Sequence, residues 1–508
     1  MMLWPLSGLG IENFPTWAVA LILAVEVGVR LAVLGFIPEN RRPQTAMAWL
    51  IAIFFIPALA LPLFLLIGSA KLSARRQRRQ ARINEEVLKA TRGMDLSDQL
   101  RDLDEQLGGT AALNRNLGAF PVQDGNSIDL ISDYDDYFDQ LADVIDEAEQ
   151  YVHVLFYIIG ADDTAGKVLD ALERAAARGV TVRLLYDHVG SMRTNGYRRL
   201  VRRLRMAGRR WPDHFNWHRV LPIRPFRLRF SRPDLRNHRK IVVVDGHTAF
   251  TGSANLIESQ YLRRTSRRLG RHWVELNARI TGPAVSGLDI VFATDWYAES
   301  DENLALTRHG HPLMVDIEAD EAARGGSLAQ VVPSGPGFPD ENNLRLFNDL
   351  IYQATDRIVV CTPYLVPDDS LLYALTNASY RNVDVVVLVT EKADQLLVQH
   401  AQQSYYQALL EAGVRILRYP APDVLHSKFM VIDRDTAVLG SSNMDMRSFT
   451  LNLEVTLMVV DEETVRAFDQ ILAQYFAISS EVTAEAWAGR SLATRYLDNV
   501  SRLTAALQ

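Results

Sequence analysis

A short pattern of chemically active residues occurs twice in this chain of 508 residues. In the first copy, His238 and Lys240 precede an apolar run that leads to Asp245, and a Gly-Ser-x-Asn segment ends the copy at Asn255. The second copy begins at His426, 188 residues later, and repeats six defined positions at the same internal spacing. If the two copies pack about a pseudo-twofold axis, the fold must bring two imidazoles and two ammonium groups to one place.

Each copy predicts a β-strand, because the four apolar residues after the polar pair (241–244 and 429–432) are mostly β-branched. Successive side chains of a strand point to opposite faces. His238 and Lys240 therefore share one face, as do His426 and Lys428.

The motif aspartates, Asp245 and Asp433, lie an odd number of residues from the histidines and so fall on the opposite strand face. Glycine follows Asp245, which is a strong hairpin-turn signal. We expect both aspartates to hold turns or position other groups, without touching the imidazoles.

These residue types suit a phosphodiester substrate. Two lysines can stabilise the negative charge that spreads over the phosphoryl oxygens without a metal ion or cofactor, helped by hydroxyl and amide donors in the returning segments. The predicted substrate-binding donors are Ser253, Asn255, Ser441 and Asn443. One neutral imidazole can attack phosphorus while the other, protonated, gives a proton to the leaving alkoxide. The spacing leaves open which histidine is the nucleophile.

Two carboxylates lie in later strand-like runs, at Glu275 and Glu454. We expect them to accept the other ring N–H of the histidines, which fixes the tautomer and raises basicity. The alternative is that each His-x-Lys is only a surface dipeptide on an edge strand, and the matched Gly-Ser-x-Asn returns argue against it.

Both copies resemble the His-Lys-Asp motif of the phospholipase D superfamily, and the closer resemblance is to its bacterial cardiolipin synthases. Further segments typical of that family are 334–336, 362–367, 440–448 and 451–454. The resemblance implies that His238, Lys240, Asp245, His426, Lys428 and Asp433 form the motif's catalytic set. One departure lies near Trp273, where the family usually has Asp-x-His and this chain has Glu275 and Asn277.

The pattern beyond residue 120 alternates helices with strands, which predicts βαβ units and a mostly parallel sheet flanked by helices. With the resemblance, the expected fold is α/β: two duplicated phospholipase D-like αβα sandwich halves related by a pseudo-twofold axis. We expect the first half at 120–310, with its motif at 238–255, and the second at 311–508, with its motif at 426–443.

Two apolar runs near the start, at about 15–37 and 44–68, are each long enough to cross a bilayer core of about 30 Å. Glu26 and Arg30 are spaced to pair on one helix face, and Pro57 and Pro62 are expected to kink the second run. We predict a transmembrane helical hairpin over residues 1–70 and a basic juxtamembrane linker over 71–119.

The distribution of basic residues predicts the orientation. No lysine or arginine precedes Arg30, so the basic start of a signal peptide is missing. The loop between the runs carries Arg41 and Arg42, whereas six lysines and arginines lie between residues 71 and 82. The positive-inside rule then predicts a multi-pass protein of the cytoplasmic membrane, with both termini and the catalytic region in the cytoplasm.

Composition narrows the alternatives. The single cysteine, Cys361, excludes a disulfide framework and a cysteine-based zinc site. A net charge of -7 argues against a general nucleic-acid binder, although residues 193–240 hold sixteen lysines and arginines. That basic segment can bind nucleic-acid phosphates, bind anionic lipid headgroups or form a solvated basic face. The N-terminal apolar runs favour binding of lipid headgroups.

The resemblance implies a membrane phosphatidyltransferase that makes cardiolipin and glycerol from two phosphatidylglycerol molecules through a phosphatidyl-histidine. Its partners are then phosphatidylglycerol and other anionic phospholipids, without nucleic acid, and the oligomeric state stays open. The alternatives are a phospholipase D, another transphosphatidylase of the superfamily, a nuclease that has no need of membrane spans, and a non-catalytic scaffold.

Overall fold

The computed structural model describes residues 15–39, 41, 43–68, 72, 74–91, 105–223, 232, 234–304, 326–338 and 340–503. The chain groups into two compact units. One consists of residues 1–71 with 225–234, and the other of residues 72–224 with 235–508. Both copies of the repeated motif belong to the second unit.

The described residues of the N-terminal unit form the helices α1 (Thr16–Phe36), α2 (Pro43–Phe55) and α3 (Pro57–Ile67). Among the described residues, α1 is the one helix long and apolar enough to cross a membrane. The second predicted span is not one kinked helix. It breaks at Ile56, whose φ of -134° and ψ of 58° are not helical, because the following proline has no N–H and restricts the residue before it.

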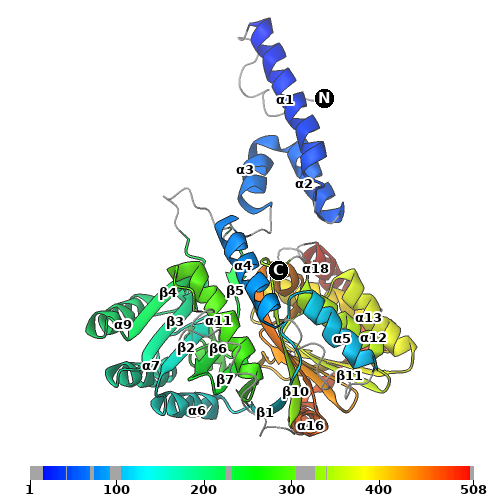
Figure 1. The fold of residues 1–508 in the computed structure, drawn as a ribbon. Helices are drawn as coiled ribbons and strands as arrows, with labels where there is room; N and C mark the ends of the chain where they lie inside the picture. Colours follow the sequence, from blue (N-terminus) through cyan, green and yellow to red (C-terminus); the bar gives the residue numbers. More distant parts are fainter. Residues whose placement is uncertain are drawn as a thin grey trace. The chain divides into compact units, whose positions relative to one another are not determined.

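Helices α2 and α3 fold back on each other (Figure 1). Arg41, before α2, donates from Nε to the carbonyl of Gly68, after α3, over 3.1 Å. The rings of Trp49 and Phe64 meet edge to face with centroids 5.3 Å apart. Glu26 and Arg30 of α1 pair as expected.

The second unit is built on a mixed 16-stranded sheet. From one edge to the other its strands run β20 (Ser480–Glu481), β14 (Arg415–Tyr419), β13 (Asp384–Thr390), β11 (Arg357–Cys361), β16 (Phe429–Ile432), β17 (Thr436–Gly440), β19 (Asn452–Val460), β10 (Ser327–Ser334), β1 (Gln123–Ile131), β9 (Asn277–Thr281), β7 (Thr248–Gly252), β6 (Ile241–Val244), β2 (Tyr151–Phe156), β3 (Thr181–Asp187) and β4 (Phe215–Val220). The remaining strand, β5 (Arg236–Asn237), pairs with β19, and two further pairs are formed by β12 (Leu365–Val366) with β18 (Met444–Asp445) and by β8 (Trp273–Val274) with β15 (Val424–Leu425).

The order of the strands is the same on both sides of the central β1–β10 pair. Outward from β1 it is β9, β7, β6, β2, β3 and β4, and outward from β10 it is β19, β17, β16, β11, β13 and β14. The pairs β2–β3, β3–β4, β11–β13 and β13–β14 are parallel, as predicted for βαβ units. The prediction of a mostly parallel sheet is wrong for the centre, because the motif hairpins and their neighbours pair antiparallel.

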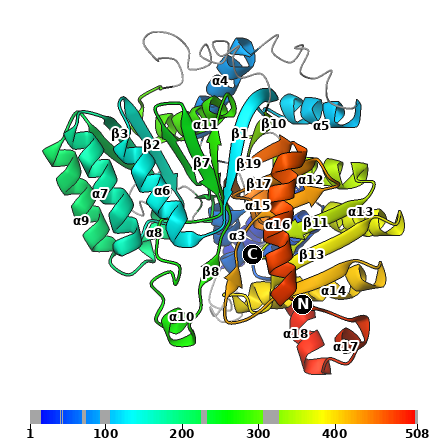
Figure 2. The ribbon, with the colours of Figure 1, turned by 90° about the horizontal axis from the view of Figure 1, so that it is seen from below.

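Helices cover both faces of this sheet (Figure 2). Helices α6 (Tyr134–Asp146), α7 (Asp163–Ala177) and α9 (Tyr197–Arg210) pack on one face of the strands around the first motif. Helices α12 (Asn342–Gln353), α13 (Asp369–Tyr380) and α14 (Leu396–Glu411) do the same around the second. Helices α11 (Ala284–Ser300) and α16 (Glu462–Ile478) join one core on the remaining faces.

Shorter or peripheral helices complete the unit. They are α4 (Ala74–Ala90), α5 (Glu105–Asn116), α8 (His188–Met192), α10 (Arg264–Leu269), α15 (Met446–Thr450), α17 (Ala484–Ala488) and α18 (Leu492–Arg502). Basic helix α4 contacts the end of α11 through ion pairs of Arg75 with Asp301 and of Arg76 with Glu299.

The two motif aspartates occupy the tight turns of the β6–β7 and β16–β17 hairpins, at φ values of 53° and 50°. The carboxylate of Asp245 accepts the backbone N–H groups of residues 149–151 over 2.7–2.8 Å. That of Asp433 accepts the N–H groups of residues 355–357 over 2.8–2.9 Å. Each aspartate thus anchors the turn that leads into β2 or β11.

Replacement of Asp245 by asparagine is expected to destabilise the protein by about 1–3 kcal/mol, because an amide N–H₂ then faces the N–H of Glu149, which had donated to a carboxylate oxygen. Thermal unfolding of the detergent-solubilised protein measures the effect. Asp213→Asn serves as the control, since Asp213 is exposed in a turn. Equal unfolding midpoints for the two variants would contradict the anchoring role.

Candidate active site

Each motif histidine is held by a strand that follows the other motif. Strand β5 pairs in parallel with β19, and the backbone N–H of His238 donates to Leu453 over 2.9 Å. Strand β15 pairs in parallel with β8, and the N–H of His426 donates to Val274 over 2.7 Å. The two pairings carry the histidines out of their own hairpins and toward the other motif.

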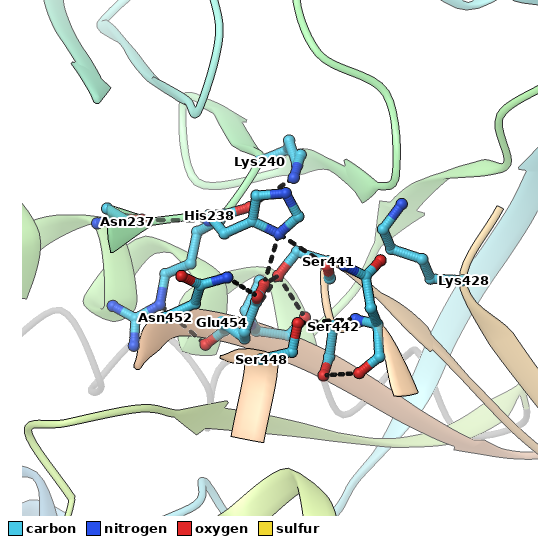
Figure 3. Close-up of polar contacts among 12 residues, drawn as sticks. Asn237, His238, Lys240, Lys428, Ser441, Ser442, Ser448, Asn452 and Glu454 are labelled. Carbon is cyan, nitrogen blue, oxygen red and sulfur yellow. Dashed lines mark hydrogen bonds and ion pairs between the residues drawn. The ribbon is translucent and has the colours of Figure 1, made fainter. Parts of the chain in front are cut away.

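The imidazole of His238 lies against the second motif (Figure 3). Its Nδ1 is 3.1 Å from Glu454 Oε2 and 3.0 Å from the carbonyl oxygen of Ser441. Both partners are acceptors, so Nδ1 carries the proton. Ser441 Oγ donates to the same carboxylate oxygen and fixes its position.

The imidazole of His426 has the corresponding partner in the first motif region. Its Nδ1 is 2.8 Å from both oxygens of Glu275. The hydroxyl of Tyr261 donates to this carboxylate over 2.9 Å and accepts from Asn255 Nδ2 over 2.9 Å. The ring of Tyr261 stacks on Trp273, with centroids 4.6 Å apart.

Both Nε2 atoms remain available for chemistry. Within the part of the chain that the structure describes, neither is hydrogen-bonded to protein. The side chains of His238 and His426 keep 10% and 9% of their surface exposed. The ring of Tyr157 contacts that of His238 edge to face at 4.8 Å, so this tyrosine lines the site. Tyr364, which follows strand β11 as Tyr157 follows β2, is instead bonded to Asp394.

The two lysines are buried, and their ammonium groups bond to the carbonyls of the motif histidines. Lys240 Nζ donates to His238 over 2.6 Å, and Lys428 Nζ to His426 over 2.5 Å. Figure 3 shows both ammonium groups on the same side of Glu454 as the His238 ring. Burial, together with the nearby Lys428, lowers the pKa of Lys240 to about 7. Burial lowers the pKa of Lys428 to about 8, although Glu275 and Glu454 favour its charged form.

Burial also keeps the imidazoles neutral. It lowers the pKa of His238 to about 4, against the attraction of Glu454, and it lowers that of His426 against the attraction of Glu275. Burial alone would raise the pKa of Glu275, but His426 and Lys428 hold it at about 2. The pKa of Glu454 is likewise lowered by His238 and Lys240 despite burial. At neutral pH the resting site therefore holds neutral histidines and ionised carboxylates.

Sequence comparison places this geometry in a family. The model of the cardiolipin synthase phospholipase D-like domain matches residues 141–296 and 347–476. Cardiolipin synthase A of Proteus mirabilis is 31% identical over 91% of this chain and 92% of its own length. Cardiolipin synthase A of Erwinia tasmaniensis is 31% identical over 93% of this chain and 94% of its own length. The chain belongs to the phospholipase D-like cardiolipin synthase family.

The family's fold also occurs in a solved structure. Phosphatidylserine synthase of Haemophilus influenzae superposes with a TM-score of 0.58 and 15% identity, over 79% of this chain and all of that chain. This similarity supports a mixed α/β architecture.

The predicted donors of the returning segments are bonded to protein groups in this family member. Ser253 Oγ donates to Leu276, and Asn255 contacts both Tyr261 and the N–H of Ile158. Ser441 bonds to Glu454, and Asn443 Nδ2 donates to Asp445 over 3.2 Å. Contact of these four side chains with a substrate stays a prediction.

Sequence reasoning missed several residues that build the site. Arg239, between the motif histidine and lysine, is buried and bonds to the carbonyl of Glu454 and to Asp295 of α11. Asn237 bonds to Asp295 as well. Tyr261, in the loop after the first motif, carries no distinguishing pattern. Arg239 was detectable in principle, because strand alternation directs it away from the histidine and into the core.

The lysine pKa values predict how activity depends on pH. Both lysines must be protonated to hold phosphate charge, so kcat/KM is expected to fall at least tenfold per pH unit as the pH rises above about 7. A bound phosphodiester raises the lysine pKa, so the alkaline limb of kcat moves to higher pH. Profiles measured in neutral detergent micelles test this, and an alkaline limb of kcat/KM above pH 9 would contradict it.

Proposed function

We propose that this member of the cardiolipin synthase family transfers a phosphatidyl group from one phosphatidylglycerol to another, which yields cardiolipin and glycerol. The observation that carries the proposal is the pair of imidazoles beside two buried lysines. Each imidazole has Nδ1 on a carboxylate, and no described residue is hydrogen-bonded to its Nε2. The names of the full-length relatives supply the substrate class.

In the first step we assign His238 as the nucleophile. Its neutral Nε2 attacks phosphorus, and the bond from phosphorus to the glycerol oxygen breaks. His426, neutral in the resting site, takes up a proton from solvent as the anionic phosphodiester binds. It then gives this proton to that oxygen, and glycerol leaves. Lys240 and Lys428 stabilise the charge on the non-bridging oxygens.

In the second step the roles of acid and base reverse. A headgroup hydroxyl of a second phosphatidylglycerol loses its proton to His426 and attacks phosphorus. The bond between phosphorus and His238 breaks, and cardiolipin is released. The contact of His426 with both oxygens of Glu275 supports this division of roles, because the two oxygens stabilise the imidazolium that must form.

The other site residues are assigned positioning roles. Glu275 and Glu454 orient the imidazoles, and Asp245 and Asp433 hold the motif turns. We propose that the phosphate site is lined by Ser253, Asn255, Ser441 and Asn443. Their hydrogen bonds to neighbouring protein groups fix the positions of these side chains. No metal ion enters either step.

Hydrolysis is the second candidate, because water can replace the acceptor lipid at the same histidine. A site of this kind uses one base for both acceptors. The same side chains would serve hydrolysis and transfer to a second lipid, so analysis of the reaction products distinguishes the two activities.

We further propose that residues 120–310 and 311–508 are duplicated phospholipase D-like αβα halves related by a pseudo-twofold axis. The identical strand order outward from β1 and β10 supports this duplication. The N-terminal unit embeds the enzyme in the cytoplasmic membrane, with the catalytic region on the cytoplasmic side, where anionic lipid is the partner and nucleic acid is not.

Incubation of the purified protein with phosphatidylglycerol is expected to give cardiolipin and glycerol in equal amounts, with no loss after exhaustive chelation. Mass spectrometry of the lipids and an enzymatic glycerol assay measure the products. His238→Ala and His426→Ala should reduce turnover by at least about 10³-fold while the protein stays folded. Phosphatidic acid without cardiolipin would identify a phospholipase D, and an EDTA-sensitive reaction restored by one divalent ion would overturn the mechanism.

Radiolabel in the phosphatidyl group should be recovered on a peptide that contains His238 after an acid-free quench. With a substrate that has a good leaving group, His426→Ala should still acquire label, because that leaving group needs no proton. His238→Ala should acquire none. Label on the peptide that contains His426 would exchange the two roles.

A further inference from the structure

The length of the apolar segment 43–68 predicts a second membrane span. In the structure this segment instead has the geometry of a re-entrant hairpin. We propose that α1 crosses the bilayer once, and that α2 and α3 enter and leave it on the same face. Residues before α1 then lie on the opposite side of the membrane from the catalytic region. The proposal concerns topology and holds whatever reaction the site catalyses.

The first support is the length and direction of the helices. At 1.5 Å per residue, α2 and α3 are about 20 and 17 Å long, and neither spans a core of about 30 Å. The ends of the segment meet: Arg41 Nε donates to Gly68, and its guanidinium lies 4.9 Å from the ring centroid of Phe64. A spanning segment would hold these ends at opposite membrane faces.

The second support is the composition of the hairpin tip. Residues 53–59 contain no polar or charged side chain. Phe55 and Leu59 are 79% and 66% exposed in the protein. A tight turn in water usually carries polar, glycine or asparagine residues, so this tip suits hydrocarbon.

The third support is the backbone at the break. Broken helices inside a membrane need partners for the carbonyls that lose their N–H donors. Arg30 of α1 donates to the carbonyl of Phe54 over 3.4 Å and pairs with Glu26. Arg30 thus supplies a hydrogen-bond donor to the hairpin tip, and Glu26 pairs with the charge of Arg30. Arg30 lies six residues from the end of α1, about 9 Å along its axis, which keeps the tip within one leaflet.

The fourth support is the distribution of basic residues. In a two-span arrangement, Arg41 and Arg42 lie across the membrane from the six lysines and arginines of residues 71–82. In the re-entrant arrangement all eight lie on one side. Residues 1–15 contain no lysine or arginine and one glutamate, Glu12. The positive-inside rule then places residues 38–42 and the catalytic region in the cytoplasm, and residues 1–15 outside.

Cysteine accessibility separates the two arrangements at two positions. In a Cys361→Ala background, single variants Ser7→Cys, Glu39→Cys and Glu85→Cys are treated with a membrane-impermeant maleimide, in intact cells and after permeabilisation. Ser7→Cys is expected to label fully in intact cells, and the other two only after permeabilisation. The unmodified protein, whose Cys361 is buried, is the control and should label only when denatured.

The two-span arrangement gives the opposite pattern, with Glu39→Cys labelled in intact cells and Ser7→Cys protected. That result would overturn the proposal. Protection of all three cysteines in intact cells would also overturn it, because α1 then does not cross. Turnover of phosphatidylglycerol by each variant is followed separately, so a failure of the proposed reaction does not alter the labelling result.

Discussion

The contact between each imidazole and a carboxylate from the other motif region is the interaction on which the site depends. His238 contacts Glu454, and His426 contacts Glu275, so neither motif carries a complete catalytic unit. The short strands β5 and β15 make these contacts possible, because they pair with β19 and β8 of the opposite region. Loss of either pairing would leave a buried carboxylate without its partner, which is costly in a low-dielectric interior.

Burial gives this arrangement its electrostatic character. Two carboxylates, two lysines and two histidines share a region almost closed to solvent, and the carboxylates balance the lysines while the histidines stay neutral. Because their pKa values are lowered, Lys240 and Lys428 lose their protons more readily in the resting site than they would in water. An arriving phosphodiester supplies the missing counter-charge, so binding and protonation of the lysines reinforce each other.

The rest of the second unit holds the two motif hairpins in place on either side of the central strands. Asp245 and Asp433 tie the hairpin turns to the loops that enter β2 and β11. Arg239 ties the first motif to α11 and to the backbone of β19. These anchors fix the backbone through side chains other than the imidazoles, lysines and carboxylates that are assigned to the chemistry.

The sequence alone determined the parts of this protein that depend on local pattern. Local pattern predicted the strands at 241–244 and 429–432 and the turn position of Asp245, because these features depend on neighbouring residues alone. The matched spacing of the motifs predicted two contributions to one site. It could not identify which carboxylate meets which histidine, since these contacts join residues more than a hundred positions apart. Nor could it identify the part of Asp295, which lies 56 residues from Arg239 in another element, or that of Tyr261, which lies in a loop without a pattern. The central antiparallel strands and the fold-back at Ile56 were decided by tertiary structure for the same reason. The hydrophobicity and length of residues 43–68 show how much of this segment is apolar. The fold-back of α3 on α2 depends on contacts between the two ends of the segment, which only the tertiary structure supplies.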